Sequence, residues 1–231
     1  MGVPVLIVGT SGTGKSASMR NLDPATYGLV NVARKPLPFK SSKRGLETDD
    51  YPTITATIGR AKADIIVLDD VQYLMANEYM RRAKETGYQK FVDIGKSFWD
   101  LVQQVIGLPP EKVVYFLGHT EADQFGNTKF KTIGKMLDEK ITVEGMFTIV
   151  LRTFVQDGRF FFSTINDGTD TVKAPIGMFP QRFVDNDLAL VDSTIREYYS
   201  LPAAKIVASA PTQTAAAPAE PVRKQHANSL V

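Results

Sequence analysis

Three short stretches of the chain are continuously apolar. They cover residues 3–8, 65–68 and 113–117, and they are rich in Val, Ile and Leu. Runs of this kind are typical of parallel strands that are buried on both faces of a sheet. Residues 27–33 and 51–57 have a weaker pattern that also predicts strands.

Helical periodicity is clearest in Gln89–Ile106, where the apolar positions Phe91, Ile94, Phe98 and Leu101 share one face. Shorter helices are expected over residues 16–22 and 185–199. Because strands and helices alternate along the chain, we expect an α/β fold with a mostly parallel central sheet flanked by helices.

The C-terminal part of the sequence predicts a β-hairpin that extends this sheet. Residues 147–154 and 159–165 alternate between apolar and polar, and Gln156-Asp157-Gly158 separates them. Asp-Gly between two such runs is a strong hairpin signal. One more short strand is expected over residues 171–173.

Composition indicates one globular domain over residues 1–200, followed by a disordered Ala/Pro-rich tail over residues 201–231. The chain has no Cys, which excludes disulfides and Cys-based zinc sites. No apolar stretch is long enough for a membrane span. The net charge is only +2, so any nucleic-acid surface must be a local patch.

A glycine-rich stretch follows the first predicted strand directly. It reads Gly9-Thr10-Ser11-Gly12-Thr13-Gly14-Lys15-Ser16. It fits the P-loop pattern G-x-x-x-x-G-K-[ST], in the strand-to-helix context that the motif requires. Its N–H groups are expected to bind phosphate at a helix N-terminus. Lys15 would contact the β- and γ-phosphates of ATP, and the Ser16 hydroxyl would ligate Mg²⁺.

Polar residues follow two of the other predicted strands. Asp69 and Asp70 end the second apolar run, and a carboxylate there can hold Mg²⁺ beside a P-loop, so Asp69 is the predicted metal ligand. His119 follows the third run. Ligands of open α/β sheets bind at the carboxyl ends of strands, so His119 is placed to sense the γ-phosphate or to orient water. A structural role for this His is an equal alternative.

Two basic segments are candidate nucleic-acid contacts. Residues 34–44 carry five Lys or Arg and no acid, and they would either contact phosphates or form a solvated loop. Within residues 122–135, three lysines are interleaved with two aromatic residues: Phe125, Lys129, Phe130, Lys131 and Lys135. This spacing suits single-stranded DNA, whose bases stack on aromatic rings and whose phosphates pair with cations. The alternative is a mobile surface loop anchored by two buried Phe rings.

The P-loop, the Asp69 strand, the strand before His119 and the hairpin together resemble a RecA-type ATPase core. The chain is similar over residues 1–200 to phage-encoded RecA-like ATP-binding proteins of single-strand annealing and recombination. This resemblance implies ATP hydrolysis, single-stranded DNA binding, a homo-oligomeric ring or filament, a single-strand-binding protein as a further partner, and a location in the host cytoplasm. It also implies that Lys173 reaches into the ATP site of a neighbouring subunit.

One departure from the RecA-type pattern affects the catalytic base. RecA-type enzymes carry a catalytic Glu after the second strand, whereas residues 31–35 contain no acid. Asp70 stands where AAA+ ATPases have a Glu, and residues 68–72 resemble the corresponding region of AAA+ loaders. Asp70 is therefore the predicted base, with Glu121 as the next candidate. The alternative function is an AAA+-type loader or assembly ATPase that acts on a protein partner, although no lid domain is recognisable and the hairpin does not belong in one.

Overall fold

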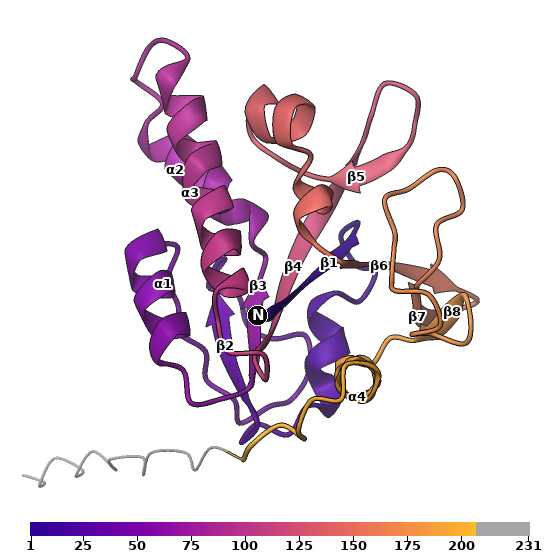
Figure 1. Cartoon of the computed structure of the whole chain (residues 1–231). Coiled ribbons are helices and arrows are strands. Elements are labelled where there is room, and N and C mark those ends of the chain that lie inside the picture. The colour runs from indigo at the N-terminus through magenta and orange to yellow at the C-terminus, as the bar shows by residue number, and fades with distance from the viewer. Residues whose placement is uncertain (207–231) are drawn as a thin grey trace, which may run out of the picture.

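The structure, a computed structural model of the chain, describes residues 1–206 and is an α/β fold with helices on both faces of a central sheet (Figure 1). The strands are β1 (Val3–Gly9), β2 (Tyr27–Asn31), β3 (Ile65–Asp69), β4 (Val113–Ala122), β5 (Thr128–Phe130), β6 (Ile149–Gln156), β7 (Arg159–Ser163) and β8 (Phe183–Asp185). The α-helices are α1 (Tyr51–Arg60), α2 (Gln72–Arg81), α3 (Gln89–Ile106) and α4 (Leu188–Tyr198). The shorter helices are η1 (Ser16–Asn21), η2 (Met136–Ile141) and η3 (Val143–Met146). Most of the predicted tail, residues 207–231, lies outside the described residues.

The strand order is β2-β3-β4-β1-β6-β7-β8, and β5 pairs with β4. The first five strands of this order run parallel to their neighbours, whereas β7 and β8 are antiparallel. This arrangement confirms the expected mostly parallel central sheet flanked by helices. It is compatible with both Rossmann-like and P-loop folds. No helix within residues 1–206 has the length and apolar character to cross a membrane.

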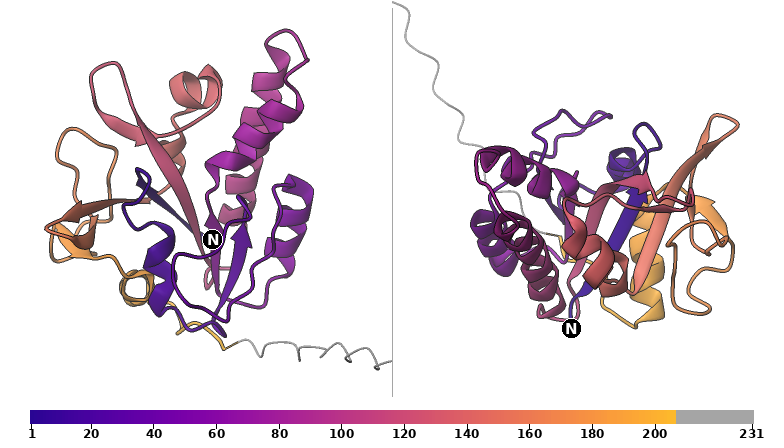
Figure 2. Two further views of the ribbon diagram at one scale, coloured as in Figure 1. Left: turned by 180° about the vertical axis from the view of Figure 1, so that it is seen from behind. Right: turned by 90° about the horizontal axis from the view of Figure 1, so that it is seen from above.

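Helices cover both faces of the sheet (Figure 2), and a hydrophobic core lies on each face. Leu6 and Val8 of β1 pack with α1, α2 and α3, whereas Val5 and Ile7 pack with η1 and α4. The same alternation runs through β3 and β4. Both faces of the parallel strands are therefore covered, which is why these strands read as continuous apolar runs.

The prediction for the longest helix is confirmed, and that for one strand is wrong. Helix α3 has the predicted bounds, and it buries its apolar face against the sheet. Residues 51–57, predicted as a strand, belong to α1. Asp50 caps this helix, because its side chain accepts a hydrogen bond of 2.9 Å from Thr53 N. Ile54 and Ile58, one turn apart, are buried, so the apolar spacing is helical rather than alternating.

The predicted hairpin is confirmed as β6 and β7, which pair antiparallel around Asp157-Gly158. Both turn residues have positive φ, 51° and 72°, as two-residue hairpin turns of type I′ require. The expected strand over residues 171–173 is reduced to a single bridge between Lys173 and Val150. Strands β7 and β8 extend the sheet beyond β6, on the side away from α1, α2 and α3 (Figure 1).

Candidate functional site

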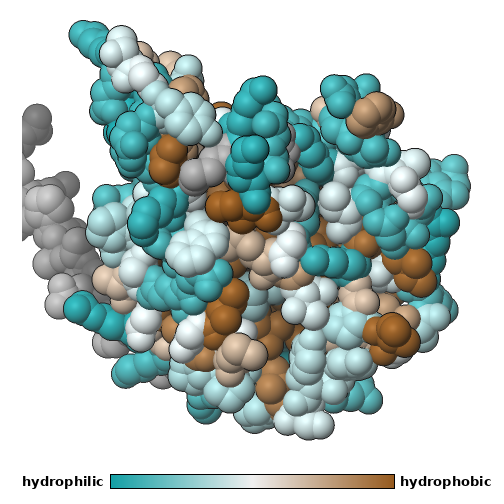
Figure 3. All heavy atoms as spheres, turned by 45° about the horizontal axis from the view of Figure 1, so that its top comes forward, coloured by the Kyte–Doolittle hydropathy of each residue, from teal (hydrophilic) through white to brown (hydrophobic). Residues whose placement is uncertain are grey.

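The parallel register gathers the predicted site residues at the carboxyl ends of the strands. Gly9 at the end of β1 pairs with His119 on β4, and Asp69 ends β3 on the other side of β4. A pocket of about 470 Å³ lies here. It is lined by Ser11, Gly12, Gly14, Lys15, Ser16, Ala17, Lys35, Pro36, Pro38, Asp69, Asp70, His119 and Phe160. Figure 3 shows one face of the molecule, where hydrophilic side chains cover the projecting parts and hydrophobic ones appear between them.

The glycine-rich loop takes its shape from close contacts that exclude side chains. A Cβ on Gly9 would lie 2.0 Å from Thr153 Oγ1 on β6. Gly14 has φ +97°, and a Cβ there would lie 2.9 Å from a ring carbon of Phe160. Thr13 Oγ1 is hydrogen-bonded to Thr153 Oγ1 at 2.6 Å, which ties the loop to β6. Glycine at both positions is therefore a requirement of the local packing.

Lys15 lies at the floor of the pocket with its ammonium group held by the loop. Its Nζ donates hydrogen bonds of 2.9 Å to the carbonyl oxygens of Gly9 and Thr10. Burial lowers the pKa of Lys15 to about 8, against the attraction of Asp70 and Asp69. The side chain remains mostly protonated at neutral pH, so it supplies a positive charge where an anion can enter.

Ser16 and Asp69 are joined across the pocket floor. Ser16 Oγ donates a hydrogen bond of 2.9 Å to Asp69 Oδ1. Burial, reinforced by the neighbouring Asp70 carboxylate, raises the pKa of Asp69 to about 6. Burying the Asp69 carboxylate beside the Asp70 carboxylate is costly unless a cation is bound. The oxygens of Ser16 and Asp69 are therefore suited to bind a cation.

Asp70 contacts two other side chains of the pocket, one from the turn after β2 and one from β4. Its Oδ2 accepts a hydrogen bond of 2.8 Å from Lys35 Nζ, and its Oδ1 lies 3.3 Å from His119 Nε2. Asp70 has φ +61°, a left-handed conformation that Asp tolerates better than most residues.

The pKa values of Lys35 and His119 are shifted in opposite directions, by different causes. The hydrogen bond to Asp70 raises the pKa of Lys35. Burial lowers the pKa of His119, and the positive charge of Lys15 adds to this. Lys35 is therefore a cation and His119 is mostly neutral at pH 7, and a neutral imidazole can both donate and accept a hydrogen bond.

Two predicted catalytic residues lie outside the pocket. Lys173 is exposed, and its backbone is hydrogen-bonded to Val150 in β6. Glu121, the second candidate for the base, lies on β4 beyond His119 and pairs with Lys129 at 3.8 Å. The structure brings together Lys15, Ser16, Asp69, Asp70 and His119, and it keeps Lys173 and Glu121 apart from them.

The segment over residues 122–135 is only partly a loop, because β4 runs on to Ala122 and β5 pairs with it. Phe130 on β5 is buried, and its ring stacks on Phe98 of α3 with centroids 5.7 Å apart. A ring buried in this way cannot stack on a base, so the prediction of a DNA contact at Phe130 is wrong. Phe125 is 79% exposed at the turn, whereas Lys135 pairs with Glu139 at 3.3 Å.

Five lining residues are not among the site residues predicted from the sequence: Ala17, Lys35, Pro36, Pro38 and Phe160. Lys35 belongs to the basic segment over residues 34–44, for which the sequence allows either a phosphate contact or a solvated loop. Elsewhere in this segment, Arg34 pairs with Asp49 at 3.1 Å, and Lys43 donates to the carbonyl oxygens of Pro24 and Tyr27. Phe160 lies in the hairpin, and no sequence signal connects that element with the loop.

The donor set at the floor of the pocket fits Mg²⁺ in one particular way. Within residues 1–206, no group of three or more His, Asp or Glu side chains could hold a metal ion by itself. Mg²⁺ commonly binds to one or two protein oxygens and takes its other ligands from water and substrate phosphates. Ser16 Oγ and Asp69 Oδ1 supply two such oxygens next to Lys15. The site therefore fits a metal ion that arrives with a phosphate ligand.

Comparison of the sequence with protein-family models and with curated proteins finds no significant match.

Proposed function

We propose that the protein is a P-loop ATPase with a RecA-like core, which binds Mg²⁺-ATP in the pocket at the end of β1. The observation that carries this proposal is the convergence of Lys15, Ser16 and Asp69, three residues predicted from two separate motifs, on one pocket floor. The strand order supports it, because β4 lies between β1 and β3 and so places His119 between the loop and the carboxylates. Ligands of open α/β sheets bind at such strand ends.

In this proposal each residue at the pocket floor has a distinct role. The loop N–H groups and Lys15 would bind the phosphates, and Ser16 and Asp69 would hold Mg²⁺, which neutralises phosphate charge. The helix after the loop is a 3₁₀ segment of 6 residues, so its dipole is small. Most of the attraction for phosphate would therefore come from Lys15, the metal ion and the loop N–H groups.

Hydrolysis would use the cluster of Asp70, Lys35 and His119. Water would attack the γ-phosphorus and transfer a proton to Asp70, while the bond to the β-phosphate oxygen breaks and that oxygen keeps the electron pair. His119 would help to orient the water or sense the γ-phosphate. Asp70 accepts a hydrogen bond from Lys35. The attacking water would therefore have to approach the carboxylate from the side that Lys35 does not occupy.

The experiment that tests this function is ATP binding by Lys15→Ala, measured by calorimetry with Mg²⁺ present. Loss of measurable binding is expected, because Lys35, the other lysine of the pocket, is hydrogen-bonded to Asp70 and does not replace the charge of Lys15 within the loop. Lys62→Ala is the matched control, since Lys62 is an exposed lysine remote from the pocket. Circular dichroism would verify that both variants fold. Wild-type affinity in folded Lys15→Ala would refute the site.

We also propose a homo-oligomer in which Lys173 of one subunit completes the ATP site of the next. Lys173 is exposed and does not line the pocket of its own subunit. This supports a role in the site of a neighbouring subunit rather than in its own. A cation that acts on the transferring phosphoryl group can raise the rate about a thousandfold. Lys173→Ala mixed with Lys15→Ala should therefore recover ATPase activity, because hybrid interfaces combine an intact loop with an intact Lys173. Activity no greater than the sum of the two separate variants would contradict action in trans.

The proposed partner is single-stranded DNA, contacted through Phe125, Lys129, Lys131 and Lys135. The alternative, an ATP-dependent loader that acts on a protein, gains support from the burial of Phe130 and from the carboxylate partners of Lys129 and Lys135. Stimulation of ATP hydrolysis by single-stranded DNA would favour the first function. A lack of any response would favour the second.

A further inference from the structure

The pocket has an aromatic wall that the proposed phosphate chemistry does not use. Phe160 of β7 lines it beside the glycine-rich loop, and its ring is close enough to exclude a Cβ at Gly14. The side chain is nevertheless 43% exposed, so part of the ring faces the opening. Its own backbone is fixed, because Phe160 O accepts a hydrogen bond of 3.2 Å from Asn186 N. A partly exposed ring on a fixed backbone, in the lining of a polar pocket, suits a flat ligand group.

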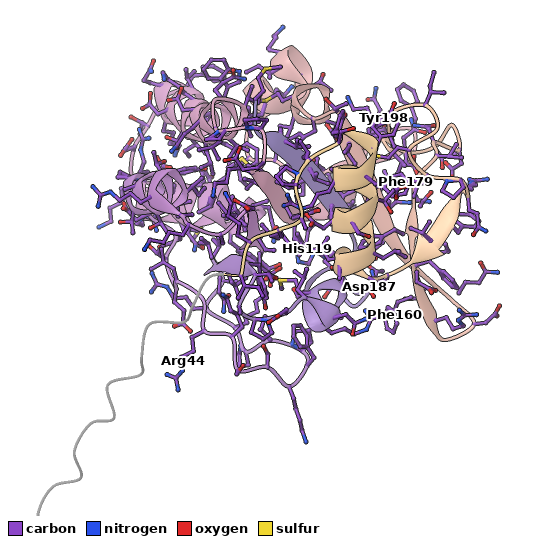
Figure 4. The ribbon with its side chains drawn as sticks, turned by 60° about the horizontal axis from the view of Figure 1, so that its bottom comes forward. Arg44, His119, Phe160, Phe179, Asp187 and Tyr198 are labelled. Carbon is purple, nitrogen blue, oxygen red and sulfur yellow. The ribbon has the colours of Figure 1, made fainter. Side chains whose placement is uncertain are left out.

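The two ends of the pocket differ in chemistry. Asp69, Asp70 and His119 come from β3 and β4, on one side of β1, whereas Phe160 comes from β7, on the other side. His119, the other aromatic lining residue, is engaged with Asp70. Figure 4 labels both residues, and they lie apart, with Phe160 close to Asp187 and η1.

This asymmetry fixes the direction in which a nucleotide would lie. Its terminal phosphate belongs near the carboxylates, because Ser16 and Asp69 would hold the metal ion there and Asp70 would act there. The remainder of the molecule must then extend along the loop past Gly14, away from β3 and β4. The ring at that end of the pocket is Phe160.

We propose that Phe160 is the stacking platform for the base of the bound nucleoside triphosphate. The inference rests on the proposed function, since it assumes that the loop binds the phosphates. Stacking on an aromatic side chain is tolerant of base identity, because every base has a π-face. Phe160 therefore supplies affinity for the base without selecting one purine over another.

The test compares a ligand that has a base with one that lacks it. Calorimetry would measure the binding of Mg²⁺-ATP and of Mg²⁺-tripolyphosphate to wild type and to Phe160→Ala. We expect ATP affinity to fall about tenfold in the variant, while tripolyphosphate affinity stays within about twofold of wild type. Phe160→Trp should restore ATP affinity. Phe183→Ala is the matched control, because Phe183 is 42% exposed in the same part of the sheet but does not line the pocket.

The possible failures are distinguishable. Unchanged ATP affinity in Phe160→Ala would overturn the stacking role but leave the loop as the phosphate site. An equal loss for both ligands would also overturn it, because Phe160 would then only support the loop through Gly14. A selective loss of ATP affinity in Pro38→Ala, with Phe160→Ala unaffected, would place the base at the proline side instead. Binding of neither ligand to the wild type would refute the proposed function itself.

A variant that keeps the packing at Gly14 covers the case in which Phe160→Ala does not fold. Phe160→Leu retains apolar volume beside the loop but has no π-face. A tenfold loss of ATP affinity in this variant, with tripolyphosphate binding retained, would support the proposal. Wild-type ATP affinity in Phe160→Leu would overturn it.

Discussion

Residue spacing predicts a functional role both for the glycine-rich loop and for the segment over residues 122–135. In the structure the predicted residues of the loop lie together in one pocket, whereas those of the second segment do not share one surface. Lys15, Ser16 and Asp69, from two motifs, share one pocket floor. In the second segment the pattern divides, since Phe125 faces solvent while Phe130 is buried under α3. The loop motif specifies a backbone conformation next to a strand end. The alternation of Lys and Phe in residues 122–135 specifies only which residue types are present, and no backbone conformation. A composition pattern does not determine which rings face solvent.

The largest effect is expected when the buried Phe130 and the exposed Phe125 of residues 122–135 are replaced separately. Phe130→Ala should lower the free energy of unfolding by about 3–5 kcal/mol, because it leaves a cavity against Phe98. Phe125→Ala should change it by less than about 0.5 kcal/mol, as is usual for exposed positions. Urea denaturation would measure both. Similar losses for the two variants would contradict the division of this segment into a buried and an exposed ring.

A second prediction separates the two carboxylates of the pocket. Asp69→Asn should weaken Mg²⁺-dependent ATP binding and yet stabilise the protein. The pKa of Asp69 is raised from 3.8 to about 6 in the folded state, so the cost of ionising it on folding grows as pH rises from 3.8 to about 6 and is fully present above that. Removal of the charge should add roughly 1–3 kcal/mol to the free energy of unfolding at pH 8 and little at pH 4.

Asp70→Asn is the matched variant for that comparison, and it should spare ATP binding while it reduces steady-state hydrolysis. Thermal unfolding at both pH values and calorimetry would be carried out on the two variants together. A destabilised Asp69→Asn at pH 8 would contradict the assignment of a costly buried charge. Wild-type turnover in Asp70→Asn would move the base elsewhere, with Glu121 next.

The smallest expected effects concern DNA binding by the second segment. Each of Lys129, Lys131 and Lys135 replaced by Ala should lower the slope of log affinity against log salt by about 0.7. Phe125→Ala should instead cost roughly 1–3 kcal/mol of binding without a change of slope. Salt titrations on a single-stranded oligonucleotide would separate the two signatures. A triple Lys variant with wild-type affinity and slope would redirect attention to residues 34–44 or to a protein partner.

Sequence patterns predicted most of the fold because they report burial directly. The parallel strands are buried on both faces, helix α3 has a single apolar stripe, and Asp157-Gly158 suits only a tight hairpin turn. Residues 51–57, assigned wrongly to a strand, contain Thr and Ile, which favour strands. The cap from Asp50 and the burial of Ile54 and Ile58 on one face override that preference.

The sequence alone determined the glycine-rich loop, the carboxylates at the end of β3 and the apolar strands β1, β3 and β4, because each depends on neighbours along the chain. The tertiary structure decided the rest. Register places His119 beside Gly9, the turn after β2 brings Lys35 to Asp70, and the hairpin brings Phe160 to Gly14. These residues are separated by up to 146 positions, from Gly14 to Phe160. Contacts over such distances depend on how the sheet pairs and packs, which no local pattern specifies.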